Sequence, residues 1–473
     1  MKKKILFVRT YKTLKAGGPV PPLGVLHIAS AVMNAFNDAY RIKICHLGVN
    51  GFSLYDIEKE IKDFSPDIVG VSALTCEFDL AQIVAEKAKS YDHKITVVIG
   101  GPHASLLKGN ILKDNVFDIV VIGEGERTFI DLLRVLEEES DLSRVKGICY
   151  KKAGEIFTNS PQPYIENLND FTVSSRAWNL INLRQYSGYQ NWNGVNREKV
   201  YAPIVTSRGC PFSCSFCRSR DIFGQSFRTR SSENVFQEIS DLFHAANVRE
   251  IHFFDDVFNF DAERVKQICS YIIKSKMKIS LAFPNGLRAD LMSEELIRLL
   301  RQAGTYKINY GIETIHSRSQ ALINKNLKID QVENTINQTA RAGIITNGYF
   351  IVGFPGESSA DVRKTIDFAV KSKLNNAYFF KLTDFSIAEN SYYDESKFHF
   401  YAAEDSRTGG KMKELDMNKL ILDAQQQFYL KPGRIIRNFW LSDNKFSFIK
   451  NTIESFACML QAYLERRLIK NHN

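Results

Sequence analysis

The sequence lacks the long apolar runs, the extreme charge and the dense cysteine content that mark several classes of protein. Its 473 residues include only eight cysteines, too few for a disulfide scaffold. No apolar stretch reaches the roughly 18–20 residues of a membrane-spanning helix. Met1–Lys4 lead directly into the strand-like Ile5–Val8, so we expect no signal peptide and a cytoplasmic protein. The net charge of +9 is small for this length and argues against a dedicated nucleic-acid binder.

The first 140 residues alternate short apolar runs with amphipathic stretches. The apolar runs are flanked by Gly, Pro, Asp or Ser, as is typical of strands, and the stretches between them carry helical periodicity. The predicted strands are Ile5–Val8, Arg41–His46, Ile68–Ser72, Thr96–Gly100 and Ile119–Ile122, and the predicted helices are Leu23–Ala35, Ser53–Asp63, Phe78–Ser90 and Thr128–Glu138. Five β-α units predict an α/β domain with a doubly wound parallel sheet, whose ligands bind at the carboxyl ends of the strands.

Residues 141–200 lose this alternation and are predicted to form an ordered linker. A second β-α series occupies 201–390, and its six units predict a partial (β/α)₆ barrel with an active face at the strand C-termini. Its predicted strands are Ala202–Ser207, Glu250–Asp255, Lys278–Phe283, Lys307–Tyr310, Tyr349–Val352 and Ala377–Leu382, and its helices include Glu233–Ala246, Ala262–Ser275, Ser293–Ala303, Ile329–Ala342 and Ala360–Ser372. Residues 391–473 become polar, then helical and basic, and are predicted to form a C-terminal helical region.

Three of the eight cysteines lie within eight residues. Cys210, Cys214 and Cys217 follow the first strand of the second series, and their gaps of four and three place three thiolates on one tight loop. Three thiolates suit a small iron–sulfur cluster and leave one iron of a cubane free for another ligand. A structural zinc site is the alternative, although it normally needs a fourth Cys or His nearby, and the next histidine is His244.

The cysteine motif, with Phe216 before the third cysteine and Thr-Ser-Arg-Gly-Cys-Pro around the first, resembles the signature of the radical S-adenosylmethionine enzymes. In that family the thiolates hold a [4Fe–4S] cluster whose open iron binds the amino and carboxylate groups of S-adenosylmethionine. One electron from the cluster produces a 5′-deoxyadenosyl radical, which abstracts hydrogen. The resemblance covers about residues 200–390 and implies an external one-electron reductant such as flavodoxin or ferredoxin.

Further residues that this resemblance implicates stand at later strand ends. By analogy with the family, they are Asp255 and Asp256 for the methionine ammonium, Arg288 for its carboxylate, Glu313 for the ribose, and Gly353 and Pro355 for the adenine. A carboxylate is a suitable partner for a cation. Each residue also has a structural alternative, because the aspartates can cap a helix, the glutamate can be solvated and the glycine can turn the chain.

Four segments of the first domain, in order and spacing, resemble the cobalamin-binding domain of the B12-dependent radical enzymes. They are Pro21–Gly24, Asp67–Ser72, Val98–His103 and Ile122–Glu126. Two adjacent glycines without Cβ atoms allow a large nucleotide tail to approach the sheet edge. The cofactor contacts that the resemblance implies are Tyr11, Ser72, Leu74, Gly100, Gly101, Pro102, Gly123 and Glu124. A sheet that serves only as a scaffold is the alternative.

The loop after the first strand departs from other cobalamin domains. Those domains carry Asp-x-His-x-x-Gly there, and its histidine ligates cobalt, whereas Thr10–Pro19 contains no histidine. We therefore expect the lower cobalt face to be open, capped by water, or met by Tyr11 or a residue near Thr75–Cys76. Such a face favours a cobalamin that passes its methyl group on. His27, His46 and His103 are expected to be structural or to contact the nucleotide tail.

The resemblance implies several possible functions. The first is a methyltransferase that moves a methyl group from methylcobalamin to an unactivated carbon, or to phosphorus, of a small-molecule substrate such as a peptide or lipid. A non-methylating cyclase or ring-rearranging enzyme is the alternative, and Phe428–Arg437 resembles an element of the cyclase branch. A tRNA methylthiotransferase would need a second cysteine triad, and a cobalamin sensor would not need the first. Candidate substrate contacts are Tyr306, Asn309, Tyr349, Phe380, Lys381 and Tyr392.

Overall fold

The computed structural model describes residues 2–12, 18–37, 39–114, 116–187, 196–354, 356–382, 404–405, 410–411, 414–442, 445–446, 448–450 and 452–453. Pro355 and Tyr392, both singled out above, lie outside these residues. The chain divides into two compact units. The first comprises residues 1–285 with the short segments 302–304 and 384–399, and the second comprises 286–301, 305–383 and 400–473. Each unit is described by itself.

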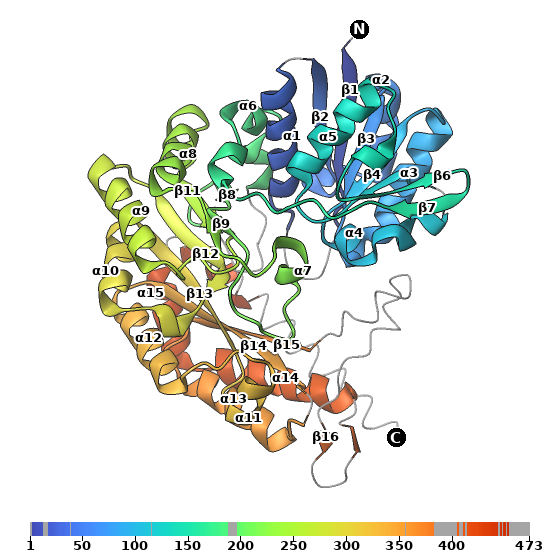
Figure 1. The fold of residues 1–473 in the computed structure, drawn as a ribbon. Coiled ribbons are helices and arrows are strands. Elements are labelled where there is room, and N and C mark those ends of the chain that lie inside the picture. The colour runs from blue at the N-terminus through green and yellow to red at the C-terminus, as the bar shows by residue number, and fades with distance from the viewer. Residues whose placement is uncertain are drawn as a thin grey trace. The chain divides into compact units, whose positions relative to one another are not determined.

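The first unit begins with a seven-stranded sheet (Figure 1) in the order β2-β1-β3-β4-β5-β6-β7. Neighbouring strands from β2 to β5 pair in parallel, and the β6–β7 hairpin pairs antiparallel at one edge. The strands are β1 (Lys3–Arg9), β2 (Tyr40–His46), β3 (Ile68–Ser72), β4 (Thr96–Gly100), β5 (Ile119–Val121), β6 (Ile148–Lys152) and β7 (Glu155–Thr158). The helices are α1 (Leu23–Phe36), α2 (Leu54–Phe64), α3 (Phe78–Tyr91), α4 (Pro102–Leu107) and α5 (Gly125–Glu137).

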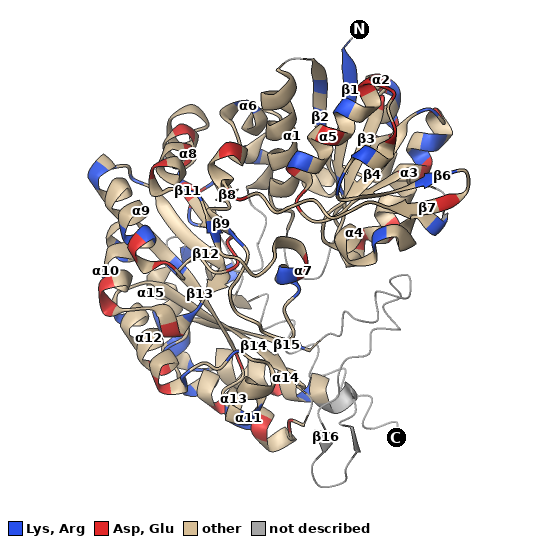
Figure 2. Cartoon of the chain, in the orientation of Figure 1, with Lys and Arg blue, Asp and Glu red and all other residues tan. Residues whose placement is uncertain are grey.

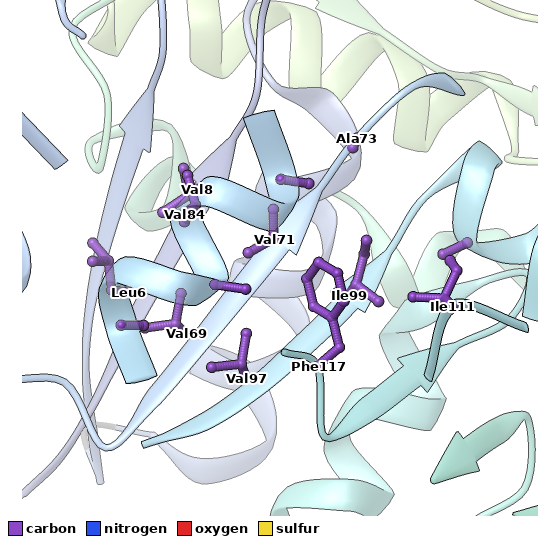
Figure 3. Close-up of a cluster of buried hydrophobic side chains, with 14 of the residues drawn as sticks. Leu6, Val8, Val69, Val71, Ala73, Val84, Val97, Ile99, Ile111 and Phe117 are labelled. Carbon is purple, nitrogen blue, oxygen red and sulfur yellow. The ribbon is translucent and has the colours of Figure 1, made fainter. Parts of the chain in front are cut away.

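Alternating residues of the central strands form two cores, one on each face of this sheet. Leu6, Val69 and Ile99 lie in the core that includes residues of α2, α3 and α4, part of which is drawn in Figure 3. Ile5 and Val98 lie in the opposite core with residues of α1 and α5. Because both faces are buried, these strands are almost continuously apolar, and the prediction of a doubly wound sheet is confirmed.

The region predicted to be a linker contributes more structure than expected. Residues 148–158 form β6 and β7, which extend the sheet by two antiparallel strands. The four residues of β7 are all exposed, so this edge strand lacks the apolar alternation by which strands are recognised. Short helical turns follow, among them α6 (Ser175–Trp178). The domain boundary at residue 140 remains a prediction.

The second sheet contains six strands in the order β15-β14-β13-β12-β11-β8, and confirms the predicted second β-α series. Its strands are β8 (Tyr201–Ile204), β11 (Glu250–Phe253), β12 (Ser280–Leu287), β13 (Thr305–Glu313), β14 (Ile345–Val352) and β15 (Asn376–Lys381). The helices that follow them include α8 (Ser232–Ala245), α9 (Ala262–Ser275), α10 (Glu294–Gln302), α12 (Ile329–Arg341) and α13 (Ser359–Lys371). The C-terminal region contributes α14 (Glu414–Tyr429) and α15 (Pro432–Leu441).

Charged residues of both signs are distributed over the outer helices of each unit (Figure 2), without a face of one sign in that view. This pattern agrees with the modest net charge of the chain. No helix in the described parts of the chain is long and apolar enough to cross a membrane.

Candidate active site

The three clustered cysteines lie on one loop whose ends are joined by a short ladder. Strand β9 (Ser207–Arg208) pairs antiparallel with β10 (Arg228–Thr229), so residues 209–227 form a closed loop, which we call the cysteine loop. The amide of Cys217 donates to the carbonyl of Cys214 in a tight turn. All three thiols are partly exposed, whereas Cys45, Cys149 and Cys269 are buried.

The three thiols are close enough to influence one another. Burial, together with the charges of Cys217, Asp256 and Cys214, raises the pKa of Cys210 to about 11. Within the described residues, no three His, Cys, Asp or Glu side chains converge on a point where one ion would bind. A single zinc ion needs such convergence, whereas each thiolate of a cubane binds a different iron. Three partly exposed cysteines on one closed loop, each able to bind a different iron, fit a cubane.

Asp255, directly after β11, is an internal anchor of the first unit. Its Oδ1 accepts hydrogen bonds from the amide and hydroxyl of Thr206, at 3.1 and 2.7 Å, and from the hydroxyl of Ser207. Its Oδ2 is buried and has no hydrogen-bond partner in the structure. Burial raises the pKa of this carboxyl, and the charge of Arg264 opposes the rise. Asp255 does not cap a helix, since α9 begins after Asp261.

Asp256 is the aspartate that faces the cysteine loop. It is partly exposed, and its charge contributes to the raised pKa of Cys210. Burial raises the pKa of Asp256 itself and the charge of Asp255 adds to this, while the Ser219 hydroxyl and the Gly209 amide oppose it. An acidic group beside a cluster loop is positioned to receive an ammonium group, so the residues present fit S-adenosylmethionine on this side.

In the second unit, Arg288 and Glu313 are linked through Lys325. Arg288 is buried, and its guanidinium donates to both carboxylate oxygens of Asp290, at 3.0 and 2.9 Å, and to the carbonyl of Lys325 at 2.9 Å. The ammonium of Lys325 pairs with Glu313 at 2.5 Å. Glu313 is therefore not a solvated surface residue. Its φ of +64° is unusual for a side chain of this size and marks a conformation held by its surroundings.

The turn after β14 is fixed by a buried glutamate that was not among the residues predicted from the sequence. Glu357 is 1% exposed and accepts hydrogen bonds from the amides of Gly353 and Phe354, both at 3.1 Å. It also accepts from the hydroxyl of Thr314, directly after Glu313, at 3.0 Å. The predicted ribose and adenine positions of the second unit are thus held together by one carboxylate.

The carboxyl edge of the N-terminal sheet carries the glycine turns predicted to bind cobalamin. Gly101 has φ +97°, and a Cβ added there would lie 3.2 Å from both the Ala73 carbonyl and the Ser72 hydroxyl oxygen. The Ser105 hydroxyl donates to the Gly101 carbonyl at 3.0 Å and accepts from the Gly123 amide at 2.9 Å. One hydroxyl therefore joins the turns after β4 and β5, and their backbone is open to a close approach.

A buried ion pair supports the loop after β3. Glu77 is 3% exposed, pairs with Arg9 at the end of β1, and accepts the amide of Leu74 at 3.0 Å. The Leu74 side chain is 40% exposed on this braced loop. Tyr11 lies instead near Gly48, which follows β2. Its ring is so close to Gly48 that a Cβ added there would clash with it.

Three of the four histidines of this domain, His27, His46 and His103, are buried and bonded to protein groups. The Nδ1 atoms lie 2.8 Å from the Phe171 carbonyl for His27, 3.1 Å from the Tyr186 hydroxyl for His46, and 3.2 Å from the Thr75 hydroxyl for His103. Burial lowers their pKa values to about 4, 3 and 4, respectively. These contacts agree with the predicted structural role.

Side chains of the second unit form an amide ladder across three strands. Asn309, Asn347 and Asn376 are in register on β13, β14 and β15. Asn376 donates to Asn347 and Asn347 donates to Asn309, both at 2.8 Å. Asn309 in turn donates to the Tyr349 hydroxyl at 2.5 Å. The aromatic rings of Tyr378 and Phe380 lie beside Tyr349, so two of the predicted substrate contacts, Asn309 and Tyr349, form one fixed group.

Two family models match this chain. Residues 12–133 match the B12 binding domain and residues 204–369 match the radical SAM superfamily. An uncharacterized methyltransferase of Pyrococcus horikoshii is 30% identical over 89% of this chain and 90% of its own length. The cytidylyl-2-hydroxyethylphosphonate methyltransferase of Streptomyces wedmorensis is 26% identical over 76% of this chain and 75% of its own. An anaerobic magnesium-protoporphyrin IX monomethyl ester cyclase of Rubrivivax gelatinosus is 28% identical over 68% and 57%.

A solved structure has the same fold. The radical S-adenosylmethionine methyltransferase TsrM from Kitasatospora setae, determined with cobalamin and a [4Fe–4S] cluster, superposes with a TM-score of 0.66 at 19% identity, covering 81% of this chain and 73% of its own. The chain is thus a radical S-adenosylmethionine enzyme with a cobalamin-binding domain. It belongs to the cobalamin-dependent branch of that superfamily, and its cofactors are a [4Fe–4S] cluster, S-adenosylmethionine and cobalamin.

Proposed function

We propose that this enzyme is a methyltransferase, which moves a methyl group from cobalamin to an unactivated carbon, or to phosphorus, of a small-molecule substrate. The observation that carries the proposal is the relative from Pyrococcus horikoshii, named as an uncharacterized methyltransferase, which matches 89% of this chain. The proposal includes an external one-electron reductant, because the reduced cluster is consumed in each radical step.

The residues of the first unit would prepare both cofactors. Cys210, Cys214 and Cys217 would hold the cluster, and Phe216 would pack beside it. Asp256, at the base of the cysteine loop, would bind the ammonium of S-adenosylmethionine, while the buried Asp255 keeps Thr206 and the strand end in place. When bound, these cofactors supply a methyl group and a hydrogen-abstracting radical.

The residues of the second unit would hold the other half of S-adenosylmethionine. Glu313 would contact the ribose, and the turn that Glu357 fixes would present Gly353 to the adenine. Arg288, already engaged by Asp290, would reach the methionine carboxylate through its remaining donors. The pair formed by Asn309 and Tyr349 would present a polar group to the substrate.

On the cobalamin domain, backbone groups would make the close contacts. Gly100, Gly101, Pro102 and Gly123 would line the nucleotide tail, with the hydroxyl of Ser72 as a hydrogen-bonding partner. Leu74, whose apolar side chain is partly exposed, would contact the cofactor without offering a nitrogen ligand to cobalt. A lower face without a strong ligand suits methyl transfer from cobalt.

A non-methylating cyclase remains the second candidate, since cyclases occur among the relatives. The element Phe428–Arg437, which resembles the cyclase branch, has structural contacts here. Arg434 donates to the carbonyls of Leu374 and Phe428, and Lys431 donates to that of Val370. Because these partners are backbone carbonyls of the same unit, the element docks the C-terminal helices and does not by itself favour cyclisation.

The test is anaerobic incubation of the reconstituted enzyme with S-adenosylmethionine, a reductant and cell extract, followed by mass spectrometry. A methyltransferase is expected to produce a metabolite heavier by one CH₂, with S-adenosylhomocysteine and 5′-deoxyadenosine in near-equal amounts. Asp256→Asn is expected to depress both by-products together. Deoxyadenosine with little S-adenosylhomocysteine and an unmethylated product would instead establish the cyclase-type reaction.

A further inference from the structure

A buried cluster of four charged residues joins the cysteine loop to the carboxyl edge of the N-terminal sheet. We call this edge, where cobalamin is predicted to bind, the cobalamin edge. It consists of Glu124 and Glu126, in the turn from β5 into α5, and Arg208 and Arg228, which face each other in the β9–β10 ladder. We call these four residues the ion cluster. Their side chains are between 3% and 8% exposed.

Glu124 is the centre of the cluster and binds both arginines. Its Oε1 lies 3.3 Å from Nη1 of Arg208 and 2.9 Å from Nη1 of Arg228. Its Oε2 accepts the same Arg228 nitrogen at 3.0 Å and the amide of Ile165 at 2.7 Å. Sequence analysis predicted that Glu124 contacts cobalamin, but its carboxylate is engaged by protein donors. Its backbone is the part that remains for the cofactor.

Arg208 and Arg228 connect Glu124 to the cysteine loop. Arg208 also pairs with Glu126, and it stands two residues before Cys210. Arg228 donates to the carbonyl of Phe223, within the loop, at 2.8 Å. Gly209, between Arg208 and Cys210, has φ +79°, and a Cβ there would lie 2.2 Å from the Ser226 carbonyl oxygen. The first cysteine is therefore separated from the ion cluster by one tightly packed residue.

A second contact joins the same two parts. Helix α7 (Ser219–Phe223), in the cysteine loop, packs against α4, which follows the Gly100–Gly101 turn. The carbonyl of Ile222 lies 3.7 Å from the position of a Cβ on Gly123. The cysteine loop thus contacts helix α4 and the Gly123 turn of the cobalamin domain.

The ion pairs between the cysteine loop and the cobalamin domain constrain the position of the loop more strictly than apolar packing would. A guanidinium bound to two carboxylates fixes direction as well as distance, whereas an apolar contact allows small displacements. The Glu126 carboxyl illustrates how strongly the charges interact: burial raises its pKa, yet Arg208 and His27 lower it enough to leave it below its ordinary value. Two positive and two negative groups balance within the cluster.

We infer that the ion cluster is a positioning device that sets the distance between cobalamin and the [4Fe–4S] cluster. Glu124 holds the turn beneath the cobalamin, and Arg208 and Arg228 hold the two ends of the loop that carries the iron. The inference rests on the two cofactors and not on methyl transfer, because a cyclase of this architecture would need the same separation.

The test measures that distance directly in the holoenzyme. With cobalt as cob(II)alamin and the cluster reduced, both centres are paramagnetic, and pulsed electron paramagnetic resonance reports their separation without any substrate. Glu124→Gln is expected to shift or broaden the distance distribution. Glu238→Gln is the matched control, since Glu238 forms an equally buried pair with Arg230 after the same ladder but does not reach the cobalamin edge.

The Arg228→Lys variant is measured as well. It keeps the positive charge but loses the guanidinium, whose two nitrogens reach Glu124 and the Phe223 carbonyl. It is expected to retain full iron and corrinoid and still to broaden the distribution, so the test does not depend on the folding of Glu124→Gln. A distribution unchanged from wild type in Arg228→Lys would overturn the inference. An equal change in Glu238→Gln would overturn it too, since it would assign the effect to general loss of stability.

Discussion

At the scale of single residues, the sharpest claim concerns which cysteines hold iron. Replacing Cys210, Cys214 or Cys217 by Ala is expected to reduce iron from about four per chain to near zero after anaerobic reconstitution, because each thiolate binds its own iron. Cys269 is a buried residue of α9, and Cys269→Ala is the control, which should retain full iron at some cost in stability. Iron and sulfide analysis measures both. Retention of zinc alone, or iron loss in the control, would contradict the assignment.

A buried histidine makes stability depend on pH. Burial lowers the pKa of His103 from 6.5 to about 4. The unfolded chain therefore binds a proton that the folded chain excludes, and stability is lost as the pH falls from 6.5 towards 4. His103→Gln should remove this pH-dependent loss of stability, which amounts to at most about 3 kcal/mol between pH 6.5 and pH 4.

Denaturant unfolding at several pH values measures the slope, and the exposed His93 supplies the control. His93→Gln should leave the slope as it is in wild type. If the slope of His103→Gln also equals that of wild type, His103 is protonated in the folded protein and the burial argument fails.

At the scale of elements, the turn from β4 into α4 is the most restrictive part of the cobalamin edge. Gly101→Ala places a Cβ against Ala73 and Ser72 at a positive φ, so it should cost about 1–2 kcal/mol and weaken cobalamin binding. Gly433→Ala in α15 meets no atom within 4 Å and should be neutral or slightly stabilising. Corrinoid retention after gel filtration, together with thermal unfolding, compares the two. Equal corrinoid retention in both variants would show that the turn does not approach the cofactor.

Elements were predicted well from sequence where both faces of a strand are buried. The bounds of β3 and β4 agree with the prediction because the apolar runs end at Ser72 and Gly100. The β6–β7 hairpin was not predicted, because β7 is exposed and carries no apolar alternation. The cysteine triad was predicted because its residues are close in sequence.

The support around the site was not predicted, because its partners are distant in the chain. Glu124 lies 84 residues from Arg208 and 104 from Arg228. A charged residue of such a pair looks like any solvated residue in the sequence. Arg208 nevertheless lies within the Thr-Ser-Arg-Gly-Cys-Pro motif, and this motif context was the one available signal.

At the scale of the whole molecule, one chain is expected to hold cobalamin without a protein nitrogen on cobalt. Protein loaded with hydroxocobalamin and reduced to cob(II)alamin should contain close to one corrinoid per chain. Its electron paramagnetic resonance spectrum should lack nitrogen superhyperfine splitting, since His27, His46 and His103 are buried and bonded to protein groups. Splitting from one nitrogen would show that a histidine, or the base of the cofactor, reaches the metal.

The central claim is that the methyl group reaches the substrate by way of cobalamin, and one labelling measurement tests it most directly. Enzyme loaded with cobalamin carrying a CD₃ group is mixed with unlabelled S-adenosylmethionine, reductant and the substrate found in the extract experiment. In the first turnover the product should carry CD₃, and in later turnovers CH₃. A first product that carries CH₃, or no added methyl group, would contradict the account.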